Sequence, residues 1–141
     1  MKKGEPIVIL EERRTERRLQ VKVGPFEASA IILELEGISS PRPLTHDLLA
    51  EIFKEGGFSL DKVELFGDSA ECLQAKLSYS KNLHSYEKEV RPSDALALAL
   101  RLEAPILASS SLLDGAGKGS GFWLRSKILD FSDWKAGRMH A

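Results

Sequence analysis

The sequence predicts an α+β domain with a mixed, largely antiparallel β-sheet, two main helices and a C-terminal helical tail. Several short segments alternate between apolar and polar residues, which is typical of half-buried strands. Two other segments, residues 45–55 and 93–103, repeat apolar residues at the spacing of a helix. A chain of 141 residues is long enough for a single domain with a hydrophobic core.

The N-terminal half contains a predicted hairpin, one ambiguous segment and one helix. Residues 6–12 and 18–24 are expected to be strands on either side of a polar connection. Residues 26–35, FEASAIILEL, are apolar on both alternating faces, which fits either a strand buried on both sides or a helix. The β-branched residues and the preceding Gly24-Pro25 favour the strand. Residues 45–55 then form a helix that Gly56-Gly57 ends.

The C-terminal half begins with strands at residues 62–66 and 72–79, joined by a tight turn at Asp68-Ser69. Residues 83–90 form a more polar strand near an edge of the sheet. The helix from Ser93 to about Glu103 is apolar nearly all round, so it lies either between layers or at a subunit interface. Pro105 ends this helix and begins a short strand.

We divide the chain into a domain of residues 1–113, a glycine-rich linker of residues 114–121 and an amphipathic tail of residues 122–141. The linker does not fit a phosphate-binding loop, because Gly117-Lys118 is followed by glycine rather than by serine or threonine. The tail either packs back on its own domain or its dimer mate, or docks a partner through its large apolar residues. These residues are Phe122, Trp123, Ile128, Phe131 and Trp134.

The composition is that of an ordinary globular protein, and it limits the possible partners. A net charge of −1 gives no overall case for nucleic-acid binding, and the acidic middle of the chain would repel a polyanion unless metal ions intervened. No apolar run approaches the roughly 18–20 residues that span a bilayer. Cys72 is the single cysteine, so a disulfide framework cannot form within the chain. We expect a cytoplasmic protein without a membrane partner.

Two related motifs precede the two predicted helices, RPLTHDLL at residues 42–49 and RPSDALALAL at residues 91–100. Helix capping and the helix dipole explain their hydroxyl and carboxylate residues, which are Thr45, Ser93, Asp47 and Asp94. Capping does not explain Arg42, Arg91 or His46. An arginine at the positive end of a helix is unfavourable unless an anion compensates it, and the free N–H groups there bind phosphate.

The residues of these motifs suit phosphodiester hydrolysis if the two helix starts meet in space. Carboxylates such as Asp47, Asp94 and Glu27 would hold Mg²⁺ or Mn²⁺ through oxygen ligands. His46 could act as a general base or acid. The two motif arginines would neutralise the developing charge on the phosphate.

Other interpretations of the same residues remain open at this point. Asp47 shares a helical stripe with Glu51 and Glu55, so it faces solvent or a cleft. His46 borders the apolar stripe and could be a hydrogen-bonded boundary histidine. Asp94 lies two turns from Arg101, so an internal ion pair is an alternative to a metal ligand. His84 in the polar strand and His140 in the tail are assigned to solvent.

The segments GPFEASAI, RPLTHDLL and RPSDALALALR, in this order, resemble the bifunctional nuclease domain family from about Leu19 to Leu113. The resemblance implies DNase and RNase activity, an α+β fold and self-association. It implies catalytic roles for His46, Asp47, Asp94, Arg42 and Arg91, and substrate-binding roles for Glu27, Thr45 and Ser93. One position departs from the family pattern, since Glu89 stands where an aspartate is usual two residues before the second Arg-Pro.

Two functions follow as hypotheses. The first is a nuclease that cleaves DNA and RNA with little sequence preference, uses Mg²⁺ or Mn²⁺ and forms a homodimer. The alternative is a non-enzymatic module that binds an anion, a ligand or a protein, in which the two Arg-Pro motifs are structural. Salt dependence separates the two, because binding to a polyanion weakens steeply as the salt concentration rises.

Overall fold

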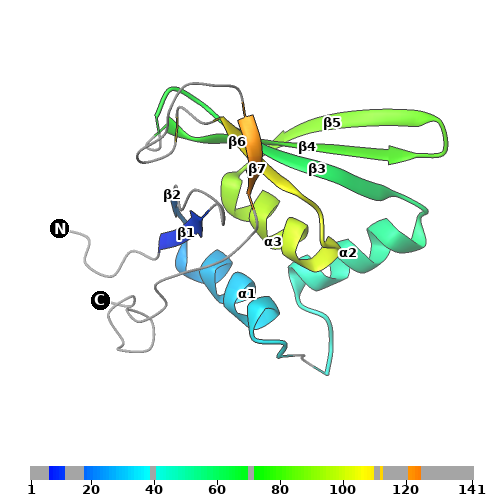
Figure 1. Ribbon diagram of the computed structural model, residues 1–141. Coiled ribbons are helices and arrows are strands. Elements are labelled where there is room, and N and C mark those ends of the chain that lie inside the picture. Colours follow the sequence, from blue (N-terminus) through cyan, green and yellow to red (C-terminus); the bar gives the residue numbers. More distant parts are fainter. Residues whose placement is uncertain are drawn as a thin grey trace.

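The computed structural model describes residues 7–11, 18–38, 41–69, 72–109, 112 and 121–124. Within these residues the chain forms an α+β fold, as predicted (Figure 1). The elements in chain order are β1 (Ile7–Glu11), β2 (Arg18–Lys22), α1 (Pro25–Leu35), α2 (Thr45–Glu55), β3 (Ser59–Phe66), β4 (Gln74–Lys81), β5 (His84–Val90), α3 (Pro92–Leu102), β6 (Ile106–Ser109) and β7 (Gly121–Leu124).

The strands form two sheets. β1 and β2 pair antiparallel in a small sheet of their own, and the five-stranded sheet has the order β5-β4-β3-β6-β7. β3 and β6 run parallel, with Val63 opposite Ile106, whereas the other neighbouring pairs run antiparallel. The predicted mixed, largely antiparallel sheet is therefore confirmed. β5 lies at an edge, where its polar sequence had placed it.

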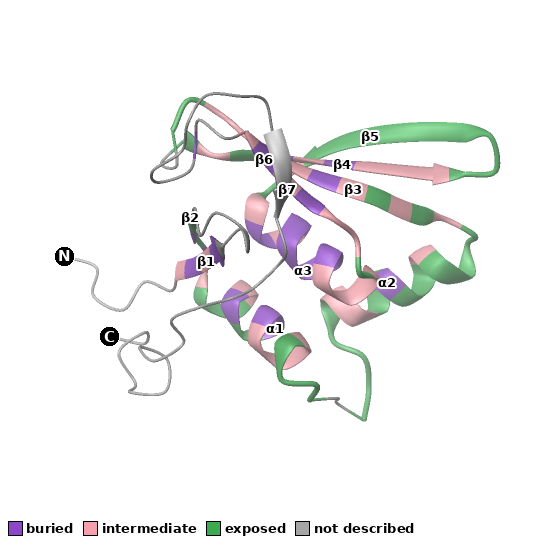
Figure 2. Cartoon of the chain, in the orientation of Figure 1, coloured by how far each residue is buried: buried purple, intermediate pink, exposed green. Residues whose placement is uncertain are grey.

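Helix α3 occupies the centre of the fold. It packs against α1, α2 and the strands β2, β3 and β4, and five consecutive residues from Ala95 to Ala99 are buried (Figure 2). The alternation of alanine and leucine lets neighbouring elements approach it closely on several sides. Burial between layers accounts for the all-round apolar character of this helix, which leaves it no free face for a subunit interface.

The prediction of a strand at residues 26–35 was wrong, because this segment is helix α1. Pro25 occupies the first helical position, where its missing N–H costs nothing. Ala28 and Ile31, three residues apart, are buried on the side that packs against α3. The apolar residues of this segment, which fitted both faces of a strand, are thus distributed around a helix that is buried on the side facing α3.

The predicted caps at Thr45 and Ser93 were also wrong. The N-cap of α2 is Leu44 and that of α3 is Arg91, and in neither helix does a cap side chain accept a hydrogen bond. In α2 the carboxylate of Asp47 accepts the backbone N–H of Leu44 at 3.2 Å instead. Thr45 is therefore the first residue of its helix and is free to use its hydroxyl elsewhere.

The C-terminal part of the chain is described only at β7, which pairs antiparallel with β6. Phe122 and Trp123 therefore belong to a strand, where a helical tail had been expected. The other proposed anchors Ile128, Phe131 and Trp134, as well as the linker residues 114–120 and His140, lie outside the described residues. In the described part of the chain, no helix combines the length and the apolar character that crossing a bilayer requires.

Candidate active site

Each of the three helices carries an acidic residue at its third position, Glu27 in α1, Asp47 in α2 and Asp94 in α3. A carboxylate in the first turn is stabilised by the positive end of the helix dipole. The helix starts converge, so these three acids come within reach of two arginines, Arg91 and Arg101, at the two ends of α3. The arrangement divides into two separate ion-pair networks.

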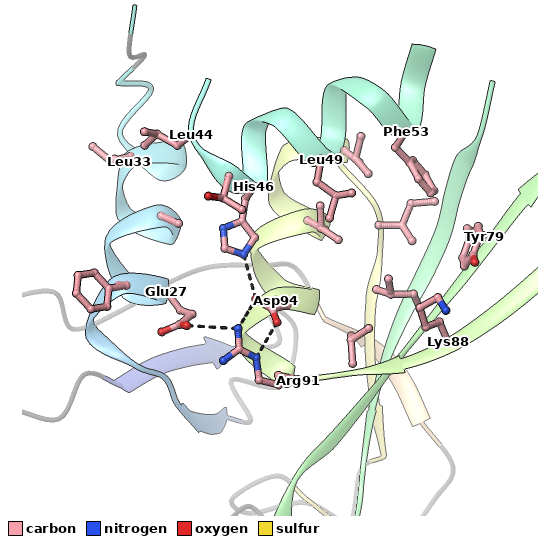
Figure 3. Close-up of a pocket in the computed structure, with 18 of the residues that line it drawn as sticks. Glu27, Leu33, Leu44, His46, Leu49, Phe53, Tyr79, Lys88, Arg91 and Asp94 are labelled. Carbon is pink, nitrogen blue, oxygen red and sulfur yellow. Dashed lines mark hydrogen bonds and ion pairs between the residues drawn. The ribbon is translucent and has the colours of Figure 1, made fainter. Parts of the chain in front are cut away.

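The first network, which we call the Arg91 network, joins the two Arg-Pro motifs (Figure 3). His46 Nε2 lies 3.0 Å from Asp94 Oδ1. Arg91 donates from Nε to Asp94 Oδ2 at 2.8 Å and from Nη2 to Asp94 Oδ1 at 3.1 Å. Arg91 Nη2 also lies 3.4 Å from Glu27 Oε2. All three helix starts thus contribute a side chain to one connected group.

The charges of this network reinforce one another. Burial favours the neutral form of Asp94, but the hydrogen bonds from Arg91 and His46 outweigh it and hold the pKa of this carboxyl below its ordinary value. The hydrogen bonds to Asp94 in turn raise the pKa of Arg91. The site therefore presents a permanent cation next to a histidine whose Nε2 faces an ionised carboxylate.

In the second network, which we call the Arg101 clamp, the arginine is almost inaccessible to solvent. The Arg101 side chain is 4% exposed, and its Nε donates to Asp47 Oδ1 at 2.6 Å. Its two terminal nitrogens donate to the backbone carbonyls of Ala97 and Ala30, each at 3.1 Å. One side chain of α3 thereby ties α1, α2 and its own helix together. Sequence reasoning had considered Asp94 as the partner of Arg101, whereas the partner is Asp47.

A cavity of about 930 Å³ opens beside the Arg91 network. Its polar end contains Glu27, Thr45, His46, Arg91 and Asp94, and its walls are mostly apolar (Figure 3). The remaining lining residues are Phe26, Ser29, Ala30, Leu33, Leu44, Leu49, Phe53, Phe58, Leu60, Leu77, Tyr79, Lys88, Val90, Leu98 and Leu102. A concave, largely apolar pocket with a few convergent polar groups is the usual form of a ligand site.

The structure brings some of the predicted site residues to this cavity and not others. Besides the Arg91 network, Thr45 lines the cavity. Ser93 is only 7% exposed and does not line it, and Asp47 is held in the Arg101 clamp. Arg42 is exposed in the segment before α2 and is not a lining residue. Glu89, the departure from the family pattern, is exposed on β5 and is also absent from the lining.

The three carboxylates expected to hold Mg²⁺ or Mn²⁺ already have protein partners, since Glu27 pairs with Arg91 and the two aspartates accept hydrogen bonds. Asp94 accepts hydrogen bonds from Arg91 on both oxygens, and Asp47 accepts from Arg101 on one oxygen and from the Leu44 N–H on the other. Among the described residues, no group of three histidine, cysteine or acidic side chains could hold a metal ion. A divalent cation would have to displace a guanidinium group, so this arrangement does not fit it.

Lys88 and the aromatic wall of the cavity were missed by sequence reasoning. Phe53 comes from α2, Phe58 from the connection before β3 and Tyr79 from β4. Sequence reasoning had placed Phe53 in a helix and Tyr79 in a strand, and it had not assigned Phe58. A signal was present in residues 84–90, because alternation in a strand separates Lys88 from its acidic neighbours Glu87 and Glu89. The Arg101 clamp left a weaker signal, namely an arginine in a helix that is otherwise apolar all round.

The model of the bifunctional nuclease domain family matches residues 8–120 of this chain. Two proteins of Mycobacterium tuberculosis, the uncharacterized protein MT1877 of strain CDC 1551 and the uncharacterized protein Rv1829 of strain H37Rv, are each 36% identical to it over 114 residues. The alignment covers 81% of this chain and 68% of each relative. The matched range extends beyond the expected limits of Leu19 and Leu113, so it includes strand β1 and most of the predicted linker.

Proposed function

Because this chain belongs to the bifunctional nuclease domain family, we propose that it hydrolyses phosphodiester bonds of DNA and RNA with little sequence preference. The observation that carries the proposal is the meeting of the two Arg-Pro motifs, with His46 Nε2 3.0 Å from Asp94 Oδ1 at the polar end of the cavity. A histidine, an orienting carboxylate and an accessible arginine are the groups that such a reaction needs. We also propose that the protein acts in the cytoplasm.

In this proposal His46 is the general base. When His46 donates its Nε2–H to Asp94, the neutral ring carries its lone pair on Nδ1. Nδ1 then takes a proton from a water molecule, whose oxygen forms a new bond to phosphorus. The bond between phosphorus and the leaving oxygen breaks, and that oxygen takes a proton from solvent. Asp94 holds the tautomer and stabilises the imidazolium that forms.

Arg91 is the phosphate-binding group in the same reaction. Its side chain is 65% exposed although two carboxylates hold it, so the guanidinium can contact the non-bridging oxygens of a substrate. Glu27 orients this guanidinium from α1. Thr45 would hydrogen-bond the phosphate from the start of α2, and Arg42 would contact a neighbouring phosphate from the exposed segment before it.

The alternative is a non-catalytic module that binds an anion with an apolar body. The specific observation in its favour is the cavity, whose walls are mostly apolar and whose volume of about 930 Å³ lies near the upper end of ordinary ligand pockets. The two hypotheses differ in their salt dependence, since a polyanion contacts several cations and a small anion contacts few.

Cleavage of labelled single-stranded RNA and DNA by the purified protein tests the proposal. We compare the wild type with His46→Gln and Asp94→Asn, and we use Asp61→Asn as a matched control because this aspartate is exposed on β3 and bonds only Ser80 among the described residues. The first two variants are expected to lose about 100-fold or more in rate. Equal cleavage by all four proteins would assign the activity to another site or to a contaminant.

The same assay includes Mg²⁺, Mn²⁺ and EDTA, because the use of a divalent cation is a separate proposal. The mechanism above assigns no step to a metal ion, so it predicts cleavage in EDTA. Cleavage that requires Mn²⁺ or Mg²⁺ would mean that a substrate-bound cation, or a rearranged Arg91 network, takes part. No cleavage under any condition would favour the non-catalytic module.

We also propose that the domain forms a homodimer through α2. Leu48, Leu49 and Ile52 in this helix are 47%, 47% and 56% exposed. Neighbouring exposed apolar side chains are typical of a protein interface. Sedimentation velocity of the wild type and of Ile52→Lys tests this, since the wild type is expected to be dimeric and the variant monomeric. A monomeric wild type would contradict it.

A further inference from the structure

Four aromatic rings form a continuous cluster from the cavity to the surface of the β4–β5 hairpin. Phe53 and Phe58 stack with ring centroids 5.3 Å apart, and Tyr79 and Tyr86 stack at the same separation. Phe58 and Tyr79 link the two pairs edge to face at 5.9 Å. We call these four residues the aromatic platform. Tyr86 is 42% exposed, so the platform ends in a ring that solvent reaches.

The strand register separates the charges of the hairpin between its two faces. Tyr79 stands opposite Tyr86, and Leu77 stands opposite Lys88, so these side chains share the face that bears the cavity. Lys81 lies over the Phe58 ring at 5.2 Å on this same side. The cavity face of the hairpin therefore combines aromatic rings with lysines.

The acidic side chains of β3 and β5 occupy the opposite face. Lys76 there lies 3.6 Å from Glu64 and 3.5 Å from Glu87, and Lys62 lies 3.7 Å from Glu64. These lysines are neutralised by carboxylates, whereas among the described residues Lys81 and Lys88 have no recorded acidic partner. The chain is weakly acidic overall, yet this one face is cationic.

Strand β5 connects the platform directly to the proposed reaction site. It runs from Tyr86 past Lys88 to Val90, and the next residue is Arg91. At about 3.3 Å per residue, Tyr86 and Arg91 are separated by roughly 17 Å. Figure 3 shows Tyr79 and Lys88 on the sheet at one side of the cavity and Arg91 and His46 at the other. A segment of a few nucleotides is long enough to contact both ends.

We infer that the substrate is single-stranded nucleic acid, with a base stacked on Tyr86 and the backbone passing Lys88 to reach Arg91. This inference rests on the proposed function and deepens it by naming the strand form. Exposed aromatic rings beside lysines bind single strands, because every unpaired base offers a face for stacking. The bases of a duplex are stacked on one another and are not available to the ring, so a duplex gains only the contacts of its phosphates.

Fluorescence anisotropy with a labelled dT12 oligonucleotide, alone and annealed to dA12, tests the inference. After each titration the oligonucleotide is recovered and checked for cleavage on a gel. Tyr86→Ala is expected to weaken binding of the single strand about 5- to 50-fold, whereas Tyr86→Phe retains the ring and binds as the wild type does. Lys88→Met is expected to reduce the salt slope of binding by about 0.7, which corresponds to one phosphate contact.

Lys76→Met is the matched control, because Lys76 lies on the neighbouring strand but on the opposite face. It is expected to leave the binding of dT12 unchanged. Equal binding of dT12 and of the duplex by the wild type would overturn the inference, and so would unchanged binding by Tyr86→Ala. If Tyr86→Ala instead dissociates a dimer and leaves dT12 binding intact, the platform is a contact between copies of this chain and the inference is likewise overturned.

The outcome is separate from that of the proposed function. Bis(p-nitrophenyl) phosphate is a small phosphodiester that can contact the Arg91 network but cannot reach Tyr86 at the same time. The Tyr86→Ala variant is therefore expected to hydrolyse it as the wild type does. If the small substrate is hydrolysed and the binding of dT12 does not depend on Tyr86, the role of the aromatic platform is contradicted and the proposed nuclease activity stands. If the binding of dT12 depends on Tyr86 but no substrate is hydrolysed, the role of the aromatic platform stands and the proposed nuclease activity is contradicted.

Discussion

The Arg101 clamp and the Arg91 network are built from the same chemical parts and differ in accessibility. In both, an arginine Nε donates to the aspartate at the third position of a helix, at 2.6 Å for Arg101 and Asp47 and at 2.8 Å for Arg91 and Asp94. The Arg101 side chain is 4% exposed and that of Arg91 is 65% exposed. The terminal nitrogens of Arg101 donate to backbone carbonyls, whereas Arg91 lines the cavity.

This difference separates an ion pair that we expect to be structural from one that we propose to be functional. Arg101 bonds two carbonyls and one carboxylate and its side chain is 4% exposed, so we expect it to stabilise the fold rather than to bind a ligand. Arg91 is held by Asp94 and Glu27 but stays open to solvent, as a phosphate-binding arginine must. Each Arg-Pro motif contributes one aspartate, but Asp47 belongs to the Arg101 clamp whereas Asp94 belongs to the Arg91 network.

The largest expected effect is on stability and distinguishes the two arginines. Arg101→Met removes the ion pair with Asp47, whose side chain is 30% exposed, and the hydrogen bonds to two carbonyls, so the free energy of unfolding should fall by about 2–4 kcal/mol. Arg91→Met removes an exposed side chain that pairs with Asp94 and Glu27, so it should lower the urea midpoint less than Arg101→Met does. Equilibrium urea unfolding followed by circular dichroism measures both. Similar midpoints for the two variants would contradict the structural role of the clamp.

The second prediction concerns activity and should reverse that order. Arg91→Met removes the guanidinium that we propose to bind phosphate, and the loss of one such donor is expected to lower kcat/KM about 100-fold. Arg91→Lys keeps the charge but cannot bond both oxygens of Asp94, so it should recover only part of the loss. The assay measures kcat/KM for the cleavage of single-stranded RNA. Arg91→Lys with full activity would show that only the positive charge matters and not the geometry.

The third prediction uses pH to compare the two aspartates. Burial raises the pKa of Asp47, but the hydrogen bond and charge of Arg101 outweigh it, so the folded-state pKa lies below the ordinary value. A lowered pKa stabilises the fold above about pH 4–5 and loses that contribution as the pH falls through the folded-state pKa. Asp47→Asn should therefore lose about 1–2 kcal/mol at pH 7 and much less near pH 2.

Asp94→Asn provides the contrast for this measurement. The pKa of Asp94 is lowered as well, by Arg91 and His46 against the effect of burial, so this variant should also flatten the acid limb of the stability curve. Only Asp94→Asn should abolish cleavage under conditions where both variants are folded. Urea midpoints at several pH values and a cleavage assay at pH 7 give both readouts, and loss of cleavage in folded Asp47→Asn would break the distinction.

Part of this comparison could be predicted from the sequence. Alternation and turn residues predicted the strands, polar composition predicted the edge strand, and helical spacing predicted α2 and α3, because those patterns are local. Segment 26–35 was assigned to a strand because its apolar residues fit two periods, and the choice depended on α3, which packs against it. Local sequence carries no information about that partner.

The site was predictable in its residue types but not in its pairings. His46 and Arg91, together with Arg42, stood out because helix capping left them unexplained, and Asp94 was a candidate as an oxygen ligand for a metal ion. That Arg101 would take Asp47, and leave Asp94 to Arg91, depends on how α1 and α2 are placed around α3. The aromatic wall depends on Tyr79 of β4 packing against Phe53 and Phe58, which lie more than 20 residues earlier in the chain. Such contacts exist only after the helices and the sheet have packed.

The smallest expected effect concerns Gly24, the N-cap of α1. A Cβ at this position would overlap Oε1 of Glu27, so Gly24→Ala must move that carboxylate although the backbone at φ −75° accepts alanine. Displacing Glu27 removes one of the two carboxylates that hold Arg91, which should raise KM about two- to fivefold and leave kcat largely unchanged. Glu27→Gln should give a similar rise. An unchanged KM in both variants would mean that Asp94 alone positions Arg91, and the Arg91 network would then consist of His46, Asp94 and Arg91.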